Sequence, residues 1–227
     1  MNALFDSYWN KWTIACALGE LLGIGAAAAT AVAVNHWVGE PATAGGKLLV
    51  LSCMLAAGAL EGFLLGSFQW RVLREKFPAI PAGQWVGATV AVAVLCWLLG
   101  MLPALHFMGR GTTAEAGFQE PSLLLVLMGA LALGLLMGSI FGLVQWMVFQ
   151  RYARESVQWV TGNALGWGLA MVWIFLAATL PDETTPTWLI LTGGLLGGAM
   201  SGLSLGVVTG FYLRKIIAQN QQKDKLA

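Results

Sequence analysis

Two acidic side chains inside long apolar segments are the residues of this sequence best suited to chemistry. Glu20 follows Trp12 by eight positions, and Glu61 precedes Trp70 by nine. If both segments are helices that begin or end on the same side of a membrane, the two carboxyls lie at a similar depth and can face each other. A charged carboxyl at the centre of a bilayer is disfavoured by roughly 2.5 to 3.5 kcal/mol. The presence of two glutamates in these segments therefore calls for a functional or structural explanation.

Two interpretations of the pair stay open. In the first, Glu20 and Glu61 handle protons or cations, as ionisable residues inside membranes often do. In the second, each is protonated, or hydrogen-bonded to a neighbour such as Asn163 or Ser201, and serves packing. The second is favoured because neither carboxyl recurs: the positions that correspond to Glu61 farther along the chain hold Met137 and Ser201.

A second polar set lies near one end of three apolar segments. Gln69 and Gln145 occupy equivalent places, and Thr209 stands at the corresponding place in the third segment. A repeated amide of this kind most often bridges helices or satisfies a backbone carbonyl. Alternatively, the three side chains line a vestibule whose basic neighbours attract an anion or a lipid headgroup. Those neighbours are Arg71, Arg74, Arg151 and Arg214. The candidate intramembrane polar site comprises Glu20, Glu61, Asn163, Gln69, Gln145 and Thr209.

The same three segments carry a glycine at every fourth position. On a helix this spacing forms a stripe without side chains, and in lipid such a stripe lets another backbone approach closely. The expected helix-packing residues are Gly58, Gly62, Gly66, Gly134, Gly138, Gly142, Gly198, Gly202 and Gly206. Three copies with the same internal spacing predict an internal repeat built on glycine zippers.

Composition places these segments in a membrane. The chain of 227 residues is 58% hydrophobic and only 10% charged, whereas soluble domains carry about a quarter charged residues. Six apolar segments cover residues 12–37, 48–73, 85–107, 122–149, 159–180 and 188–213. Each is long enough to cross a bilayer core of about 30 Å as a helix. We therefore expect an all-α integral membrane bundle of six transmembrane helices, arranged as three tandem helical hairpins with pseudo-threefold symmetry along the membrane normal.

The domain boundaries follow from this pattern. One transmembrane domain is expected over residues 1–217, with repeats at about 12–78, 84–152 and 157–217. Residues 218–227 are polar and are expected to form a frayed cytoplasmic tail. Pro41, Pro103 and Pro181 are expected to end the first, third and fifth helices, because proline cannot continue a helix.

Basic residues gather in the loops on one side of the predicted bundle. They are Lys11, Arg71, Arg74, Lys76, Arg151, Arg154, Arg214, Lys215, Lys223 and Lys225. Lys47 and Arg110 fall on the other side, and the acidic residues there are Glu40, Glu115, Glu120, Asp182 and Glu183. Since basic loops stay inside, this bias predicts a multi-pass membrane protein with both termini in the cytoplasm, and the expected membrane is the inner (plasma) membrane.

Other classes of function find little support in the sequence. The net charge of +1 provides no field for nucleic acid. His36 and His106 lie near the outer side without further ligands, so no metal site is expected. Pigment ligation by a histidine stays open, whereas Trp97, Trp167 and Trp173 are interpreted as bulk that fills space against glycine. Neither a Ser-His-Asp order nor a phosphate-binding glycine loop is present, so we expect no enzyme and no cofactor.

The glycine stripe followed by Gln-Trp-x-x-Leu-Arg, as at Gln69-Trp70, resembles a motif of uncharacterised bacterial multi-pass membrane proteins, in which it often recurs within one chain. The resemblance covers the bundle and implies no activity. Thr209-Gly210 departs from the motif, so the three sites are not equivalent. The layout is also similar to that of mitochondrial carriers, but their Pro-x-Asp/Glu-x-x-Lys/Arg signature is absent, which leaves a likeness of arrangement only.

Two functions follow from these observations. The first is a non-enzymatic scaffold or accessory subunit that packs through its glycine-striped helices, with the lipid bilayer and either a membrane-protein partner or a second copy around it. The alternative is a small proton- or ion-coupled transporter or channel that uses Glu20 and Glu61. The helix breaks at mid-membrane that many transporters use are not visible in the sequence, which favours the first.

Overall fold

The computed structural model describes residues 7–39, 41, 43–107, 121–182 and 184–224 of the chain. This part of the chain folds into six helices and contains no strand. They are α1 (Ser7–Val38), α2 (Ala44–Leu73), α3 (Ala82–Phe107), α4 (Leu123–Phe149), α5 (Gln158–Thr179) and α6 (Thr187–Asp224). All six are long and apolar enough to cross a membrane, so the all-α six-helix fold predicted from the sequence is confirmed. The pseudo-threefold symmetry stays a prediction.

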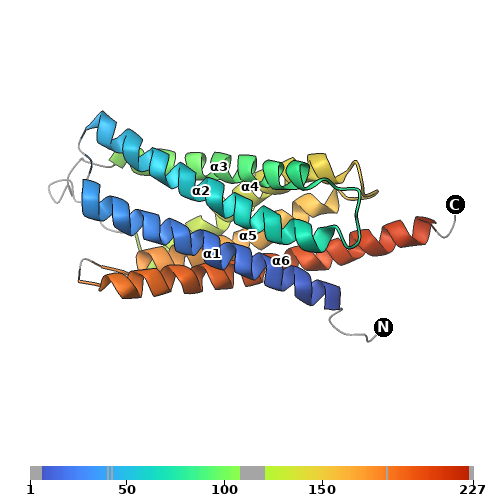
Figure 1. Cartoon of the computed structure of the whole chain (residues 1–227). Helices are drawn as coiled ribbons and strands as arrows, with labels where there is room; N and C mark the ends of the chain where they lie inside the picture. Colours follow the sequence, from blue (N-terminus) through green and yellow to red (C-terminus); the bar gives the residue numbers. More distant parts are fainter. Residues whose placement is uncertain (1–6, 40, 42, 108–120, 183, 225–227) are drawn as a thin grey trace.

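The helices form a ring in chain order. Each helix packs against the one before and the one after it, and α6 closes the ring against α1. The contact between α3 and α4 is the least extensive of the six. Figure 1 shows that α1 begins and α6 ends at the same end of the bundle, which we call the termini end; the opposite end is the far end.

Large apolar side chains cover the outside of the bundle. Leu22, Phe63, Leu95, Leu136 and Phe211 are exposed on five different helices. In water such a continuous apolar surface would be unfavourable, whereas lipid tails accept it. The outer surface therefore suits a bilayer as solvent.

Two helix ends differ from the prediction. Helix α3 continues through Pro103 to Phe107, so the expectation that Pro103 ends this helix is wrong. Proline removes one backbone hydrogen bond of the helix, and near a helix end this loss is tolerated more easily than in the middle. Pro41 and Pro181 do lie beyond the last residues of α1 and α5.

The last helix is longer than predicted, because residues 218–224 of the expected frayed tail continue α6. Asn220 anchors this extension: its Nδ2 donates to the carbonyl of Arg154 at 3.0 Å, and its Oδ1 accepts from the Arg154 amide at 2.9 Å. Gln219 Oε1 accepts from Gln158 Nε2 at 2.7 Å. The polar side chains thus hold the end of α6 against the connection between α4 and α5.

The predicted packing glycines of each even-numbered helix face the next odd-numbered helix around the ring. A Cβ on Gly62 of α2 would lie 2.7 Å from the Ala93 Cβ of α3, and a Cβ on Gly138 of α4 would lie 2.5 Å from the Asn163 carbonyl oxygen of α5. A Cβ on Gly202 of α6 would lie 2.5 Å from the Cys16 carbonyl oxygen of α1. These separations exclude a side chain, so the close approach of the helices depends on glycine.

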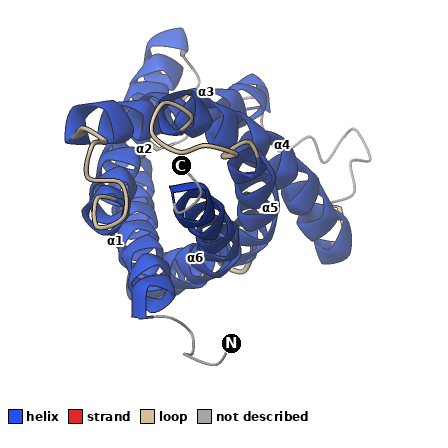
Figure 2. Ribbon diagram, turned by 90° about the vertical axis from the view of Figure 1, so that its right-hand side faces the viewer, coloured by secondary structure: helices blue, strands red, loops and turns tan. Residues whose placement is uncertain are grey.

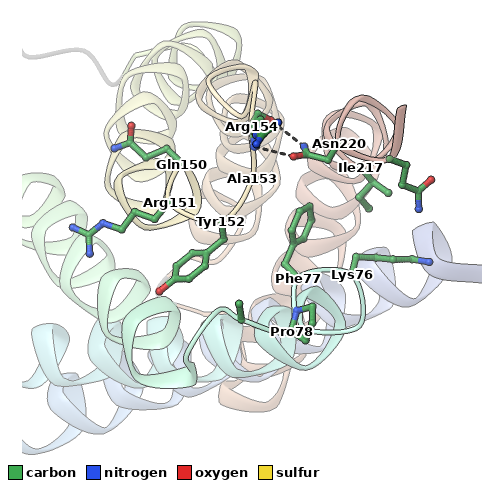
Figure 3. Close-up of a pocket in the computed structure, with 12 residues that line it drawn as sticks. Lys76, Phe77, Pro78, Gln150, Arg151, Tyr152, Ala153, Arg154, Ile217 and Asn220 are labelled. Carbon is green, nitrogen blue, oxygen red and sulfur yellow. Dashed lines mark hydrogen bonds between the residues drawn. The ribbon is translucent and has the colours of Figure 1, made fainter. Parts of the chain in front are cut away.

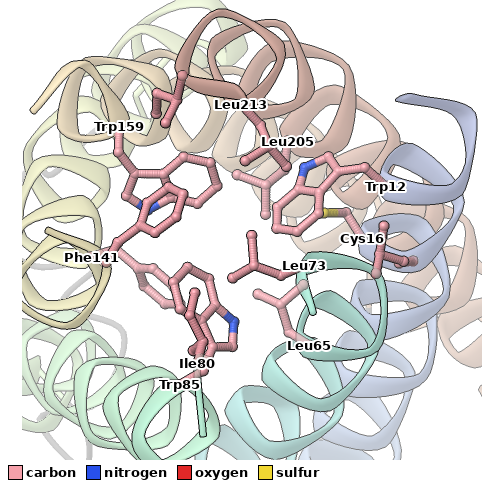
Figure 4. Packing of buried hydrophobic residues seen from close by; sticks show 14 of the residues in the cluster. Trp12, Cys16, Leu65, Leu73, Ile80, Trp85, Phe141, Trp159, Leu205 and Leu213 are labelled. Carbon is pink, nitrogen blue, oxygen red and sulfur yellow. The ribbon is translucent and has the colours of Figure 1, made fainter. Parts of the chain in front are cut away.

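Aromatic and aliphatic side chains fill the interior toward the termini end (Figure 4). The rings of Trp12 and Trp159 have their centroids 5.7 Å apart, and those of Trp85 and Trp159 are 5.9 Å apart. The other fully buried members include Leu65, Leu73, Phe149, Leu205 and Leu213. This half of the bundle is therefore a packed core.

Candidate functional site

Glu61 lies inside the bundle on α2 and is bonded to a tryptophan of α3. Its side chain is buried, and its Oε2 accepts a hydrogen bond from Trp97 Nε1 at 2.6 Å. The missing side chain of Gly58 makes this bond possible, because a Cβ there would overlap the Trp97 indole. Gly58 precedes Glu61 by three residues, so the two share one face of α2. Glycine thus positions the tryptophan that holds the carboxyl.

A cavity of about 350 Å³ lies beside this pair. Its walls come from α1 to α5, and they are apolar except at Glu61, which is the charged side chain among the described lining residues. The aromatic and sulfur-containing residues of the wall include Cys96, Trp97, Met137, Phe141, Trp167 and Phe175. A buried carboxyl at the edge of an apolar cavity is a typical arrangement for a site that binds a small molecule.

Glu20 has different surroundings, although Gly23, three residues farther along α1, packs against the Glu61 side chain. It is fully buried on α1, where Gly198 and Gly202 of α6 pack against it. Within the described part of the chain, neither of its carboxyl oxygens has a hydrogen-bond partner, and Glu20 does not line the cavity. The two glutamates are therefore neighbours with separate environments.

The hydrogen bonds suggested for the glutamates from sequence are not formed. The Ser201 hydroxyl is buried without a partner among the described residues, and Asn163 Nδ2 donates to the Trp159 carbonyl of its own helix at 3.0 Å. The suggestion that Asn163 or Ser201 satisfies a carboxyl is therefore wrong. The partner that Glu61 does have, Trp97, was interpreted from sequence as bulk filling. No spacing in the sequence indicates this contact, because it depends on how α2 and α3 are rotated about their axes.

Gln145 is the centre of a buried polar network near the termini end. Its Nε2 donates to Gln69 Oε1 at 3.1 Å and to Thr89 Oγ1 at 3.0 Å. Its Oε1 accepts from Trp159 Nε1 at 3.1 Å. One amide therefore connects α4 to α2, α3 and α5.

Thr209 makes the corresponding contact between α6 and α1. Its hydroxyl accepts from Trp12 Nε1 at 2.9 Å and donates to the Leu205 carbonyl at 2.6 Å, while Gln69 Nε2 approaches Cys16 Sγ at 3.6 Å. Since Gln69, Gln145 and Thr209 are buried and bonded, they bridge helices and do not line a vestibule. Sequence reasoning missed Trp12 and Trp159 as their partners, although their place at the start of equivalent helices was a usable signal.

The basic residues near the termini end do not converge on one point. A pocket of about 370 Å³ there is lined by Lys76, Arg151 and Arg154 among others, but in Figure 3 the Lys76 and Arg151 side chains extend away from it on opposite sides. Lys76 Nζ lies 5.6 Å from the centre of the Tyr8 ring, and Arg74 lies 4.9 Å from that of Trp70. The positions of Arg74 and Arg151 therefore do not favour the alternative in which these arginines attract a common anion.

The remaining candidates give no further site. His36 is exposed near the end of α1, and the His106 side chain lies outside the described part of the structure. Within that part, no group of three or more His, Cys, Asp and Glu residues could hold a metal ion. Several charges used for the orientation prediction also lie outside the described residues, namely Glu40, Arg110, Glu115, Glu120, Glu183, Lys225 and the side chain of Lys223.

The fold indicates the class of this protein: the described part of the chain holds six helices that are long and apolar enough to cross a membrane, as in a polytopic membrane protein. No protein-family model, no curated protein and no solved structure matches the chain. Its function must therefore be argued from its own geometry.

Proposed function

We propose that this protein binds a small hydrophobic molecule inside the membrane, in the cavity beside Glu61. The observation that carries this proposal is the cavity itself: about 350 Å³ of space, with apolar walls and one buried carboxyl. Ligand sites are commonly cavities of about 300 to 1,000 Å³ with mostly apolar walls and a few polar groups that fix orientation. The cavity has both properties.

The packing of the rest of the bundle supports this interpretation. Protein interiors are normally filled, because a void loses contacts along its whole lining. Here the half toward the termini end is filled by large side chains, whereas space is left where Trp97, Trp167 and Phe175 meet. A bundle that served assembly alone would gain stability from larger side chains at these walls. A binding carrier or receptor also fits the filled interior better than an open channel does.

A scaffold or accessory role is the second candidate, and the glycine contacts favour it. In this proposal three copies of an internal repeat are joined by glycine zippers, which hold α2 on α3, α4 on α5 and α6 on α1. The zippers are then used within the chain, so a partner or a second copy would have to dock on the lipid-facing leucines. Both proposals place the protein in a bacterial inner membrane with its termini in the cytoplasm.

Occluding the cavity tests the binding proposal. Gly100 lines the cavity, and a Cβ built on it meets nothing within 4 Å, so Gly100→Phe can add a ring without distorting α3. The probes are benzyltrimethylammonium and its uncharged isostere neopentylbenzene, and the readout is the rise of the unfolding temperature in detergent micelles. We expect at least one probe to stabilise the wild type and to lose this effect in Gly100→Phe.

A matched control separates occlusion from a general effect of the substitution. Gly129 of α4 is equally open to a Cβ but does not line the cavity, so Gly129→Phe should keep the response to the probes. If neither probe stabilises the wild type, or if Gly100→Phe responds as strongly as Gly129→Phe, the cavity is not a binding site and the scaffold role becomes the better proposal.

A further inference from the structure

We infer that the ligand of the cavity is a hydrophobic organic cation, such as a tertiary or quaternary amine, whose positive charge pairs with the Glu61 carboxylate. This inference rests on the proposed binding function and names the chemical class of its ligand. Three features of the cavity point to this class: its charge, its aromatic walls and its adaptable sulfur-containing side chains.

The charge of the cavity is one-sided. Among the described residues that line it, Glu61 is acidic and none is Lys, Arg or His. The hydrogen bond that Glu61 has on this wall comes from the neutral Trp97 indole and reaches one carboxyl oxygen. A buried carboxylate without a counter-charge is strongly disfavoured, and a bound cation supplies the missing charge.

The aromatic residues of the walls suit the same ligand. Trp97, Phe141, Trp167 and Phe175 all line the cavity, and the rings of Phe141 and Trp167 lie with centroids 4.9 Å apart and planes tilted by 43°. The negative face of an aromatic ring attracts a cation, most strongly when both are removed from water. Quaternary ammonium groups are commonly recognised by several rings in this way. The apolar part of the ligand fills the remaining space.

The other wall residues allow the cavity to adapt to ligands of different shape. Met137 and Met171 line it from α4 and α5. Methionine has three rotatable bonds and a polarizable sulfur, so it repacks around different apolar groups. We therefore expect the charge to be required for tight binding, whereas the apolar part can vary.

An isosteric pair of probes separates the cation from the shape. Benzyltrimethylammonium and neopentylbenzene differ only in a charged nitrogen in place of a carbon. Each is titrated against wild type and Glu61→Gln, and the concentration that gives half of the full rise in unfolding temperature is compared for each probe. For each probe, the half-maximal concentration of Glu61→Gln is divided by that of the wild type. This ratio cancels the partition of the probe into the micelle. We expect the cation to bind at least about tenfold more weakly to Glu61→Gln, since removing one partner of a desolvated charge pair has at least this effect.

Three further variants serve as controls. Glu20→Gln makes the same change in a buried glutamate that does not line the cavity, and it should keep the preference for the cation. Glu61→Asp keeps the charge and should keep the preference as well. Glu61→Met is a second uncharged variant, with the residue that stands at the corresponding position 137 of α4, and it provides the comparison if Glu61→Gln does not fold.

The outcomes for this inference and for the binding proposal differ. Suppose that Gly100→Phe abolishes binding, but that Glu61→Gln weakens the binding of the cation no more than that of the neutral isostere. The cavity then binds a neutral molecule, and the cation inference is wrong. If Gly100→Phe leaves both responses unchanged, the binding proposal itself fails. A cation-specific loss in Glu61→Gln or Glu61→Met, with Glu20→Gln unaffected, supports both.

Discussion

At the scale of single residues, Gln145 forms side-chain hydrogen bonds to three other helices. Its side-chain amide donates to Gln69 and Thr89 and accepts from Trp159, and these bonds lie inside the bundle toward the termini end. Hydrogen bonds between transmembrane helices contribute about 0.6 kcal/mol each on average. Its position makes it the residue through which α2 to α5 are held in register.

We therefore predict that Gln145→Leu lowers the free energy of unfolding by roughly 2 kcal/mol, the sum of three bonds of about 0.6 kcal/mol. Thr209→Val loses the bond from Trp12 and should have a smaller effect. Gln150→Leu, at an exposed position five residues farther on and directly after α4, is the control and should change stability little. Reversible unfolding in mixed detergent micelles measures all three, and an equal effect of Gln145→Leu and Gln150→Leu would contradict the bridging role.

The site was only partly accessible from the sequence at this scale. The depth of Glu61 could be estimated from helical rise, because Trp70 marks the end of the same helix. The partner of Glu61 could not be predicted from the sequence, because the Trp97 indole reaches the Glu61 carboxyl only where Gly58 leaves space for it. A contact of this kind depends on the rotation of two helices about their axes. Hydrophobic periodicity is weak in these helices, since lipid and core are both apolar, and it does not reveal that rotation.

At the scale of elements, the glycines of α4 fall into two groups, and the four-residue spacing separates Gly138, which belongs to the stripe, from Gly129, which does not. Gly138 of α4 faces the backbone of α5, with the Asn163 carbonyl oxygen 2.5 Å and the Trp167 Cβ 2.7 Å from the position of an added Cβ. Gly129 of the same helix has nothing within 4 Å of that position. One glycine therefore determines a helix contact, and the other does not.

Alanine scanning of this pair should give opposite signs. Gly138→Ala forces α4 away from α5, and overpacking of this kind typically lowers stability by about 1 to 3 kcal/mol. Gly129→Ala meets no obstacle and should be neutral or stabilising by up to about 1 kcal/mol, because alanine favours helix more than glycine does. The free energy of unfolding in detergent gives both values, and a stable Gly138→Ala protein would refute the close α4 to α5 packing.

The turn before α6 has its own electrostatic signature. The Thr184 and Thr185 hydroxyls and backbone amides bond to Asp182 and hold the pKa of its carboxyl below the usual value. We predict that Thr184→Val raises this pKa toward the ordinary value of about 3.9. Because the folded pKa is the lower one, the stabilising effect of this turn is present above the ordinary pKa and is lost as the pH falls through the folded one.

An NMR titration of the Asp182 side-chain carbon measures the pKa directly in wild type and variant. Thr192→Val is the matched control, since the Thr192 hydroxyl bonds to carbonyls of its own helix and does not contact Asp182. Equal Asp182 pKa values in wild type and Thr184→Val would show that these hydrogen bonds do not persist in solution.

The anchoring of the α6 extension can be tested through one backbone amide. The Arg154 amide donates to Asn220 Oδ1, so Asn220→Ala should expose this amide and speed its hydrogen exchange. Gln222→Ala, at an exposed position of the same extension, should not. Slow exchange at Arg154 in both variants would mean that the extension is not held in this way.

The elements were predicted well from composition and their ends less well. Six apolar segments sufficed for six helices, because a bilayer excludes other spanning structures for such lengths. The apolar pattern cannot reveal how far a helix continues outside lipid. Outside lipid, the end of a helix depends on single contacts such as those of Asn220, or on whether the helix can continue through a proline such as Pro103.

At the scale of the whole molecule, the ring of helices places both ends of the chain together. Helix α1 begins and α6 ends at the same end of the bundle (Figure 1). This follows from an even number of spans. The number of spans was predicted from the sequence. The packing of α6 against α1 became clear only from the contacts that Gly202 and Gly206 make with α1 in the structure.

The side of the membrane on which the termini lie is still a prediction from the basic loops. We expect a fluorescent protein fused after residue 227 to fold and fluoresce in the cytoplasm. A cysteine introduced at Thr184, in the connection between α5 and α6, should react with a membrane-impermeant maleimide from outside intact cells. Labelling of a cysteine at exposed Arg151 instead would reverse the orientation.

The packed core at the termini end also determines what the bundle does to a membrane that maintains a voltage. Trp12, Trp85 and Trp159, with Leu73 and Leu213, fill the ring there and have no exposed surface. Such an apolar layer disfavours the passage of an ion, because a charge without compensation is costly in an apolar environment. We therefore expect this conformation not to conduct ions past the packed core, and a molecule bound at the proposed site would have to reach it from the lipid or from the far end.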